Sequence, residues 1–455
     1  MFLTSALRTM LTRSVKPFVF EGIDEIEAKK TLYYTEEKNL GLYVHIPFCR
    51  SICGFCPYCK VLYDEQTAKD YTDALRKEIA LVGNELVEFK PVGNALAENG
   101  QISDEKGKNQ DFQKKRATSL YFGGGSPGLL AHSLGRIIGE LKKYFIIEEG
   151  IGVELHPSDV TKETLSVLKN AGVTMISTGI QSFDENCLAS LGRSAADYGK
   201  IFSLLREAQF DVIDVDLIFA IPGQTIESLK ADILKAFELG ATQISTYPFI
   251  DFTYANNKEK PLKEKYKKDM LYAIAEFCRG QDLDRTSVWT FAKKGTQKYS
   301  SITRDSFLGF GVSATSLLKT QFKLNTFSIP EYIKRVDKGI KPISLRVNFT
   351  PRQRAVYYLF WRAYGMKIDE KSFNEFFDAS LSSMYGFEMA LSFFLGLVSK
   401  EIQTDENGNT YKTYTLTDKG AYYYHFIEQQ YTTSYIDKMW SISRLESWPK
   451  QIVLR

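Results

Sequence analysis

Between residues 41 and 249 the chain alternates short apolar segments with longer amphipathic ones. The short segments have the length of buried strands, and the longer ones repeat their apolar residues at three- and four-residue spacing, which is typical of helices. This alternation predicts a parallel sheet with crossover helices, and therefore an α/β fold. It leaves open whether the sheet closes into a partial barrel or stays open and doubly wound. The expected strands are residues 41–46, 119–123, 152–156, 174–179, 212–219 and 243–249, and the expected helices are 64–87, 132–145, 162–171, 195–208, 226–239 and 266–279.

A cysteine-rich loop follows the first expected strand. Four of the six cysteines lie between His45 and Cys59, in the order C-x3-C-x2-C-x2-C. Thiolates are soft ligands that suit zinc or iron–sulfur clusters. Structural zinc usually takes a second cysteine pair further along the chain, but Cys187 and Cys278 stand alone. A C-x3-C-x2-C loop can hold three corners of a 4Fe–4S cluster and leave the fourth iron open to an external ligand. A zinc loop and a group of reduced thiols remain the alternatives.

Further polar and glycine motifs fall where the later strands end. Residues 123–125 are three consecutive glycines, whose backbone can approach a ligand closely because it lacks Cβ atoms. Glu154 ends the next strand, while Asp214 and Asp216 share one face of the strand at 212–219. Burying carboxylates is costly without partners, so a ligand or an ion pair is expected there. In both α/β architectures the sites lie at the carboxyl ends of the strands. Taken singly, each motif could also be a turn or a solvated acid.

Together and in this order, these motifs resemble the radical SAM superfamily. The segments YVHIPF at 43–48, STGIQSF at 177–183 and LGR at 191–193 narrow the resemblance to the oxygen-independent coproporphyrinogen III dehydrogenase family. The resemblance implies a partial (β/α)6 barrel, a 4Fe–4S cluster and one or two molecules of S-adenosylmethionine. It implies Cys49, Cys53 and Cys56 as the cluster ligands, whereas Cys59 departs from the family spacing and is interpreted as a neighbour. The implied contacts to S-adenosylmethionine are Tyr43, Phe55, Gly123, Gly124, Gly125, Ser126, Glu154, Gln181, Arg193 and Asp216.

The resemblance also implies a chemistry and a class of substrate. Members cleave S-adenosylmethionine reductively to a 5′-deoxyadenosyl radical, with electrons from a flavodoxin- or ferredoxin-type protein. The favoured hypothesis is an enzyme that oxidises or methylates a tetrapyrrole, either a porphyrinogen or heme. The alternatives are a methyltransferase acting on another aromatic metabolite or a peptide, and a heme-binding chaperone. Relatives carry an H-N-x-x-Y-W type segment where this chain has residues 299–305 without a histidine, which disfavours the chaperone.

The length of 455 residues suggests two or three units. We expect an N-terminal extension at 1–40 and the barrel at 41–320, with a polar insertion at about 88–117. Residues 321–455 are expected to form a mostly helical, winged-helix-like domain that covers the barrel mouth.

Charge and hydropathy exclude several classes of partner. The 58 basic and 55 acidic side chains nearly balance, so we expect no nucleic-acid partner. No stretch approaches the roughly 18 apolar residues of a membrane span. The first residues lack the features of a secretory signal, and a reducing cytoplasm suits thiolates on an oxygen-sensitive cluster. We therefore expect a cytoplasmic protein.

Overall fold

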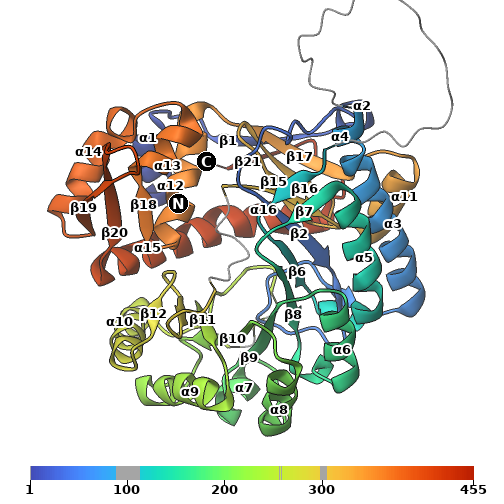
Figure 1. Ribbon diagram of the computed structural model, residues 1–455, viewed down its shortest axis with the longest axis horizontal. Helices are drawn as coiled ribbons and strands as arrows, with labels where there is room; N and C mark the ends of the chain where they lie inside the picture. The colour runs from blue at the N-terminus through green and yellow to red at the C-terminus, as the bar shows by residue number, and fades with distance from the viewer. Residues whose placement is uncertain (1, 89–112, 256, 258, 298–304, 455) are drawn as a thin grey trace, which may run out of the picture.

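The computed structural model describes residues 2–88, 113–255, 257, 259–297 and 305–454. Its main feature is a mixed sheet with helices along its faces, in an α/β fold (Figure 1). The expected insertion at 88–117 falls mostly outside the described residues, and so does most of the segment 299–305.

Six neighbouring strands of this sheet run parallel, in the order β2-β6-β8-β9-β10-β11. Each agrees with an expected strand to within two residues at either end. They are β2 (Leu40–Ile46), β6 (Leu120–Gly124), β8 (Ile151–Leu155), β9 (Met175–Gln181), β10 (Val212–Phe219) and β11 (Gln243–Pro248).

Helices connect these strands, and side-chain caps begin several of them. Asp64 accepts from the backbone of Thr67 at the start of α3, and Thr225 forms a capping box with Ser228 at the start of α9. The connecting helices are α3 (Glu65–Gly83), α4 (Glu85–Glu88), α5 (Ala131–Tyr144), α6 (Lys162–Asn170), α7 (Glu185–Ser190), α8 (Tyr198–Ala208), α9 (Ile226–Leu239) and α10 (Glu264–Gly280).

The sheet continues beyond the parallel strands on both sides. Strands β12 (Asp284–Arg285) and β13 (Thr290–Ala292) add antiparallel pairing next to β11. On the other side β14 pairs parallel with β2, and antiparallel strands follow up to β21, so the sheet crosses the boundary expected at residue 320. The division into domains stays a prediction. These strands are β14 (Ser306–Phe310), β15 (Thr315–Leu317), β16 (Gln321–Asn325), β17 (Ile343–Asn348), β1 (Phe18–Gly22) and β21 (Gln451–Leu454).

Helices predominate in the last hundred residues, where they surround a second sheet of order β18-β20-β19. These elements are α12 (Pro351–Tyr364), β18 (Lys367–Asp369), α13 (Glu370–Phe377), α14 (Leu381–Phe394), β19 (Val398–Thr404), β20 (Thr410–Leu416), α15 (Asp418–Tyr431), a π-helical turn at Thr432–Ile436 and α16 (Asp437–Leu445). The remaining elements are α1 (Phe2–Thr12), α2 (Glu25–Ala28), β3 (Phe48–Cys49), β4 (Val61–Leu62), β5 (Lys115–Ala117), β7 (Phe145–Ile147), α11 (Ile329–Asp337) and short 3-10 turns at Pro127–Leu130 and Pro157–Asp159.

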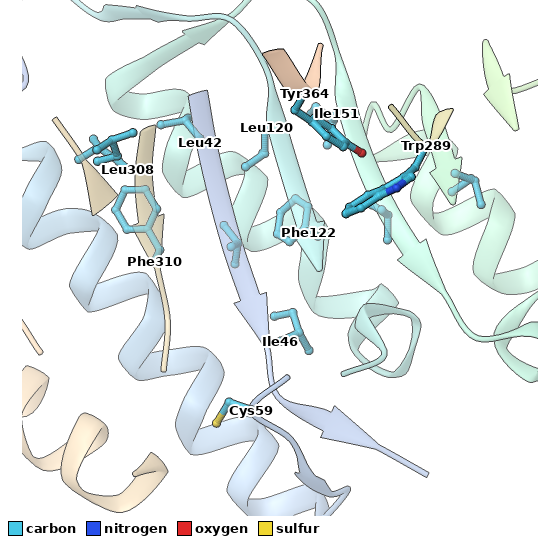
Figure 2. Packing of buried hydrophobic residues seen from close by; sticks show 14 of the residues in the cluster. Leu42, Ile46, Cys59, Leu120, Phe122, Ile151, Trp289, Leu308, Phe310 and Tyr364 are labelled. Carbon is cyan, nitrogen blue, oxygen red and sulfur yellow. The ribbon is translucent and has the colours of Figure 1, made fainter. Parts of the chain in front are cut away.

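One continuous hydrophobic core joins the parallel strands to the C-terminal helices. Figure 2 shows Leu42, Leu120 and Phe122 projecting from their strands into this core. Tyr364 of α12 reaches the same core, and its ring lies 5.5 Å from that of Trp289. The C-terminal helices are therefore packed against the parallel sheet. Within the described residues, no helix is long and apolar enough to cross a membrane.

Candidate functional site

The cysteine loop leaves the carboxyl end of β2 and is held at both ends by backbone pairing. Short strands β3 and β4 close it, with the Val61 amide donating to Pro47 (2.7 Å) and the Tyr63 amide to Cys49 (2.9 Å). Arg50, inside the loop, pairs through Nε with the buried Oδ1 of Asp159 at 3.0 Å. The loop is thus positioned against the turn that follows β8.

The thiols of Cys49, Cys53 and Cys56 are half-buried and lie within electrostatic reach of one another. Burial, and next the neighbouring Cys56 and Cys53 thiols, raise the pKa of Cys49 to about 12. Cys59 is buried and faces elsewhere: its Sγ lies 3.7 Å from the Phe327 carbonyl. The structure therefore separates Cys59 from the other three.

These three cysteines of the loop supply thiolates, the donor type that iron–sulfur clusters take. Among the described residues, no three His, Cys, Asp or Glu side chains are arranged to hold one metal ion. In a cubane each cysteine binds a different iron, so the ligand sulfurs need not converge on one point. The assignment of Cys49, Cys53 and Cys56 as cluster ligands stays a prediction.

The glycine run packs directly on the cysteine loop. Gly124 has φ +118°, and a Cβ there would lie 2.5 Å from the ring of His45; a Cβ on Gly125 would lie 2.5 Å from the Phe48 carbonyl oxygen. Only glycine allows this approach at Gly124. Ser126 is buried, and its hydroxyl donates to the carboxylate of Asp159, the same residue that pairs with Arg50.

Glu154 is held at the end of β8 by two donors. The Tyr121 hydroxyl donates to Oε1 at 2.6 Å, and the Gly124 amide donates to Oε2 at 3.2 Å. The ring of Tyr43 stacks on that of Tyr121 with centroids 6.3 Å apart. Burial, and next the neighbouring Asp216 carboxylate, raise the pKa of Glu154 to about 7.

Asp214 and Asp216 share the face of β10 that the sequence predicts. Ser177 on β9 lies between them, with its Oγ 2.9 Å from Asp216 Oδ2 and 3.4 Å from Asp214 Oδ2, while Ser245 on β11 donates to Asp214 at 3.0 Å. Burial raises the pKa of both aspartates, and the neighbouring Asp216 charge is the next largest cause for Asp214. No cationic side chain of the described residues lowers the pKa of Glu154 or Asp216.

Gln181 and Arg193 lie together at the end of β9. Gln181 has φ +72°, where the pairing of β9 with β10 shifts register. The side-chain amide nitrogen of Gln181 packs over Gly179, 2.8 Å from the position that a Cβ on this glycine would occupy. The Arg193 guanidinium donates to the Gly179 carbonyl at 3.0 Å. Phe55 of the cysteine loop packs beside them against a small cluster formed by Cys187, Leu191, Ile218, Ile221 and Phe249.

Helix α16 lies within residues 321–455, the segment expected to cover the barrel mouth, and it packs against the cysteine loop through contacts that the sequence did not specify. Arg444 donates to the Pro57 carbonyl at 2.6 Å, and the Trp440 ring lies 6.0 Å from that of Tyr58. Asp437, at the start of α16, accepts from the amide (2.8 Å) and the hydroxyl (2.6 Å) of Thr253, in the loop after β11.

Tyr121 and Ser177 were also missed as site residues. Strand alternation carries a signal for Tyr121, because it shares the face of Gly123, and for Ser177, because it shares the face of Gly179. A tyrosine or a serine on a strand does not by itself indicate a functional site; the role of each becomes visible only once the acid that it contacts is known.

Comparisons with known proteins agree with this geometry. A model of the radical SAM superfamily matches residues 102–236. The chain is 27% identical over 328 residues to the heme chaperone HemW of Lactococcus lactis, covering 69% of this chain and 77% of that protein. It is 26% identical over 330 residues to the oxygen-independent coproporphyrinogen III oxidase of Escherichia coli, covering 66% of each. The solved structure of coproporphyrinogen III oxidase (HemN) from E. coli, a radical SAM enzyme, superposes with a TM-score of 0.69 at 23% identity, over 91% of this chain and 95% of that one. This structural similarity extends the shared α/β fold to the C-terminal helices.

Proposed function

Because the chain belongs to the radical SAM superfamily, and within it to the family of the oxygen-independent coproporphyrinogen III oxidases and the heme chaperone HemW, we propose that it is a radical SAM enzyme acting on a tetrapyrrole. When bound, a 4Fe–4S cluster would supply the electron that cleaves S-adenosylmethionine to a radical able to abstract hydrogen from the substrate. Cys49, Cys53 and Cys56 are the residues that would hold the cluster. An external flavodoxin- or ferredoxin-type protein would supply the electrons.

The observation that carries the proposal is a pair of half-buried acids, Glu154 and Asp216, which no cationic side chain of the described residues neutralises. Both residues are half-buried, and the effect of burial on both pKa values exceeds that of their hydrogen bonds. Burying carboxyl groups is costly unless a partner stabilises their charge. S-adenosylmethionine carries a sulfonium and an ammonium group, so it is a ligand of the required charge.

The side chains around these acids have defined roles in the proposed site. Tyr121 and the Gly124 amide orient the Glu154 carboxylate, and Ser177 orients Asp216. The glycine run lets the ligand approach the backbone. Helix α16 reduces the access of water to the cysteine loop, which strengthens electrostatic interactions inside the site.

A tetrapyrrole is the substrate class we favour, because both kinds of relative are named for such molecules. Three aromatic residues lie together near the acids: Tyr247, Trp289 and Tyr364. The ring centroids of Tyr247 and Trp289 are 6.0 Å apart. Burial, then Tyr364 and the two aspartates of β10, raise the pKa of Tyr247. Among the possible reactions we propose oxidation, since nothing in the site favours methyl transfer.

Heme binding is the second candidate, supported by the similarity to HemW. Two of the four histidines are not free to ligate heme iron. Both ring nitrogens of His45 have partners, the Tyr43 hydroxyl at 3.0 Å and the Cys59 carbonyl at 2.8 Å, and His425 is buried against Gln429. Ligation of heme iron by histidine would therefore fall to the exposed His132 or to His156.

Product analysis on the anaerobically reconstituted and reduced protein tests the proposal. With S-adenosylmethionine and a porphyrinogen we expect 5′-deoxyadenosine and oxidised porphyrin, and no S-adenosylhomocysteine. Titration with S-adenosylmethionine would show whether one or two molecules bind. Stoichiometric heme uptake without turnover would favour the second candidate, and tetrahedral zinc on sulfur ligands would overturn both the cluster and the enzyme proposal.

A further inference from the structure

Helix α14 is apolar on two opposite sides, and only one of them is covered. Leu381, Tyr385 and Met389 are buried against the rest of the chain. Phe387 and Phe394 lie on the other side and are 70% and 85% exposed. A helix that is apolar all round is normally buried all round. The exposed side therefore lacks a partner in the described part of the chain.

Strand β19 extends this exposed surface. Alternation places Val398, Lys400 and Ile402 on one face of the strand. That face meets α14, because Val398 is buried and the Lys400 ammonium lies 5.1 Å from the centre of the Phe393 ring. Ile402 is on the same face and is 71% exposed. The apolar face of α14, as we define it, consists of Phe387, Leu391, Phe393, Phe394, Leu395 and Ile402.

The apolar face of α14 is large enough for a stable contact. If each of its residues has about 200 Å² of surface, their exposed fractions amount to roughly 700 Å². The largest apolar patch of a typical monomer is about 300–600 Å². A standard interface buries about 800 Å² on each partner. Figure 1 places α14 and β19 together at the margin of the molecule, away from the parallel strands, where a partner would meet no obstacle from the barrel.

We propose that the apolar face of α14 pairs with the same face of a second copy of this chain, about a two-fold axis. A two-fold axis places each charged side chain near the axis close to the same side chain of the second copy, and like charges repel. A face with few charged side chains is therefore best suited to such an axis. The single charged residue of α14 is Glu388, which is mostly buried and pairs with Arg13 at 2.5 Å. Self-association therefore meets no electrostatic opposition from this helix.

Strand β19 is compatible with the same axis. It lies at the edge of its three-stranded sheet, with one side of its backbone free of a strand partner among the described residues. Antiparallel pairing of two copies centred on Ile402 would set Ile402 against itself and Lys400 against Thr404. Centring on Lys400 or Glu401 would oppose like charges, which is unfavourable. Helix α14 itself has no Lys or Arg for lipid headgroups; the ammonium groups beside its apolar face are those of Lys400, near the Phe393 ring, and Lys419, which donates to the Leu395 carbonyl.

Sedimentation analysis of the full chain at micromolar concentration tests this proposal. We expect a species of twice the 51.8 kDa chain mass for the wild type. Phe394→Lys and Phe387→Lys should weaken dimerisation at least about tenfold, since each buries a charge against its own copy. Lysine at 394 lies in the last turn of α14, where the helix dipole favours it, so folding should be retained. Equal thermal midpoints would verify this.

Ile26→Lys is the matched control, because Ile26 is 77% exposed in α2, outside the apolar face of α14. This variant should sediment like the wild type. A wild type that stays monomeric over the whole concentration range overturns the proposal, and so does an equal loss of dimer in the control. Binding of the monomeric wild type to anionic lipid vesicles, lost in Phe394→Lys, would assign the face to a membrane surface instead.

Discussion

Glu154→Gln tests the electrostatic basis of the proposed site with little change of shape. Glutamine keeps the side-chain volume, and its carbonyl can accept from the Gly124 amide while its amide donates to the Tyr121 oxygen. What it removes is the negative charge. A hydrogen bond to a charged group contributes about 1.5–3 kcal/mol, so affinity for S-adenosylmethionine should fall by about 10- to 150-fold at pH 8.

The pH dependence of the same affinity gives a second, independent signature. The carboxyl of Glu154 must be ionised to bind a cation, and its pKa is raised to about 7 without one. Lowering the pH through that value protonates the group, so the wild type should bind about tenfold more weakly at pH 6 than at pH 8. Glu154→Gln should lose most of this dependence, because it has no proton to gain.

The assay is equilibrium dialysis of S-adenosylmethionine against the anaerobically reconstituted protein at the two pH values. Glu148→Gln is the matched control, since Glu148 precedes the opposite end of β8 and pairs with Arg116 near the surface. It should bind like the wild type. Affinity of Glu154→Gln within twofold of the wild type at pH 8 would refute the reasoning, and an unchanged pH profile would assign the titration to another group.

Three further perturbations address the cluster, the glycine run and the covering helix. Cys53→Ala should lose the iron, sulfide and visible absorbance of the reconstituted protein while Cys59→Ala keeps them; equal loss in both would contradict the ligand assignment. Gly124→Ala should lower the free energy of unfolding by about 1–3 kcal/mol or more, because its φ is left-handed and its Cβ has no room. Gly139→Ala, inside α5 with no neighbouring atom within 4 Å, should be neutral or stabilising by up to about 1 kcal/mol, and equal denaturant midpoints for the two would argue against the strain. Trp440→Ala should make oxygen bleach the cluster several-fold faster by stopped-flow absorbance, since it uncovers the cysteine loop; an unchanged rate would mean that α16 gives no protection.

The parallel strands were predictable because each carries its own local signal. The strand at 212–219 is a continuous apolar run interrupted only by two acids, and it occurs as β10 with the same bounds. Thr225 was recognisable as a cap from its position before an apolar helical pattern. The interpretation of Cys59 as a neighbour of the ligands came from its departure from the family spacing that the resemblance implies.

Contacts between distant segments had no comparable signal. Arg444 meets Pro57 across nearly the whole chain, and neither residue type indicates the other. Likewise the chemistry of Glu154 depends on Tyr121, a residue that in sequence is indistinguishable from an ordinary core tyrosine. Local propensity and spacing predict elements, whereas such pairings depend on how the completed sheet brings the elements together.

The pairing of β1 with both β17 and β21 makes the sheet's construction depend on the order of synthesis. Strand β1 is synthesised long before β21, so one of its two edges stays open until residues 451–454 arrive. An unpaired strand edge is a template for wrong partners during that interval. Ending the chain at residue 450 would leave β1 at the edge of the sheet permanently. We expect such a truncation to lower the yield of soluble protein while the parallel strands still assemble.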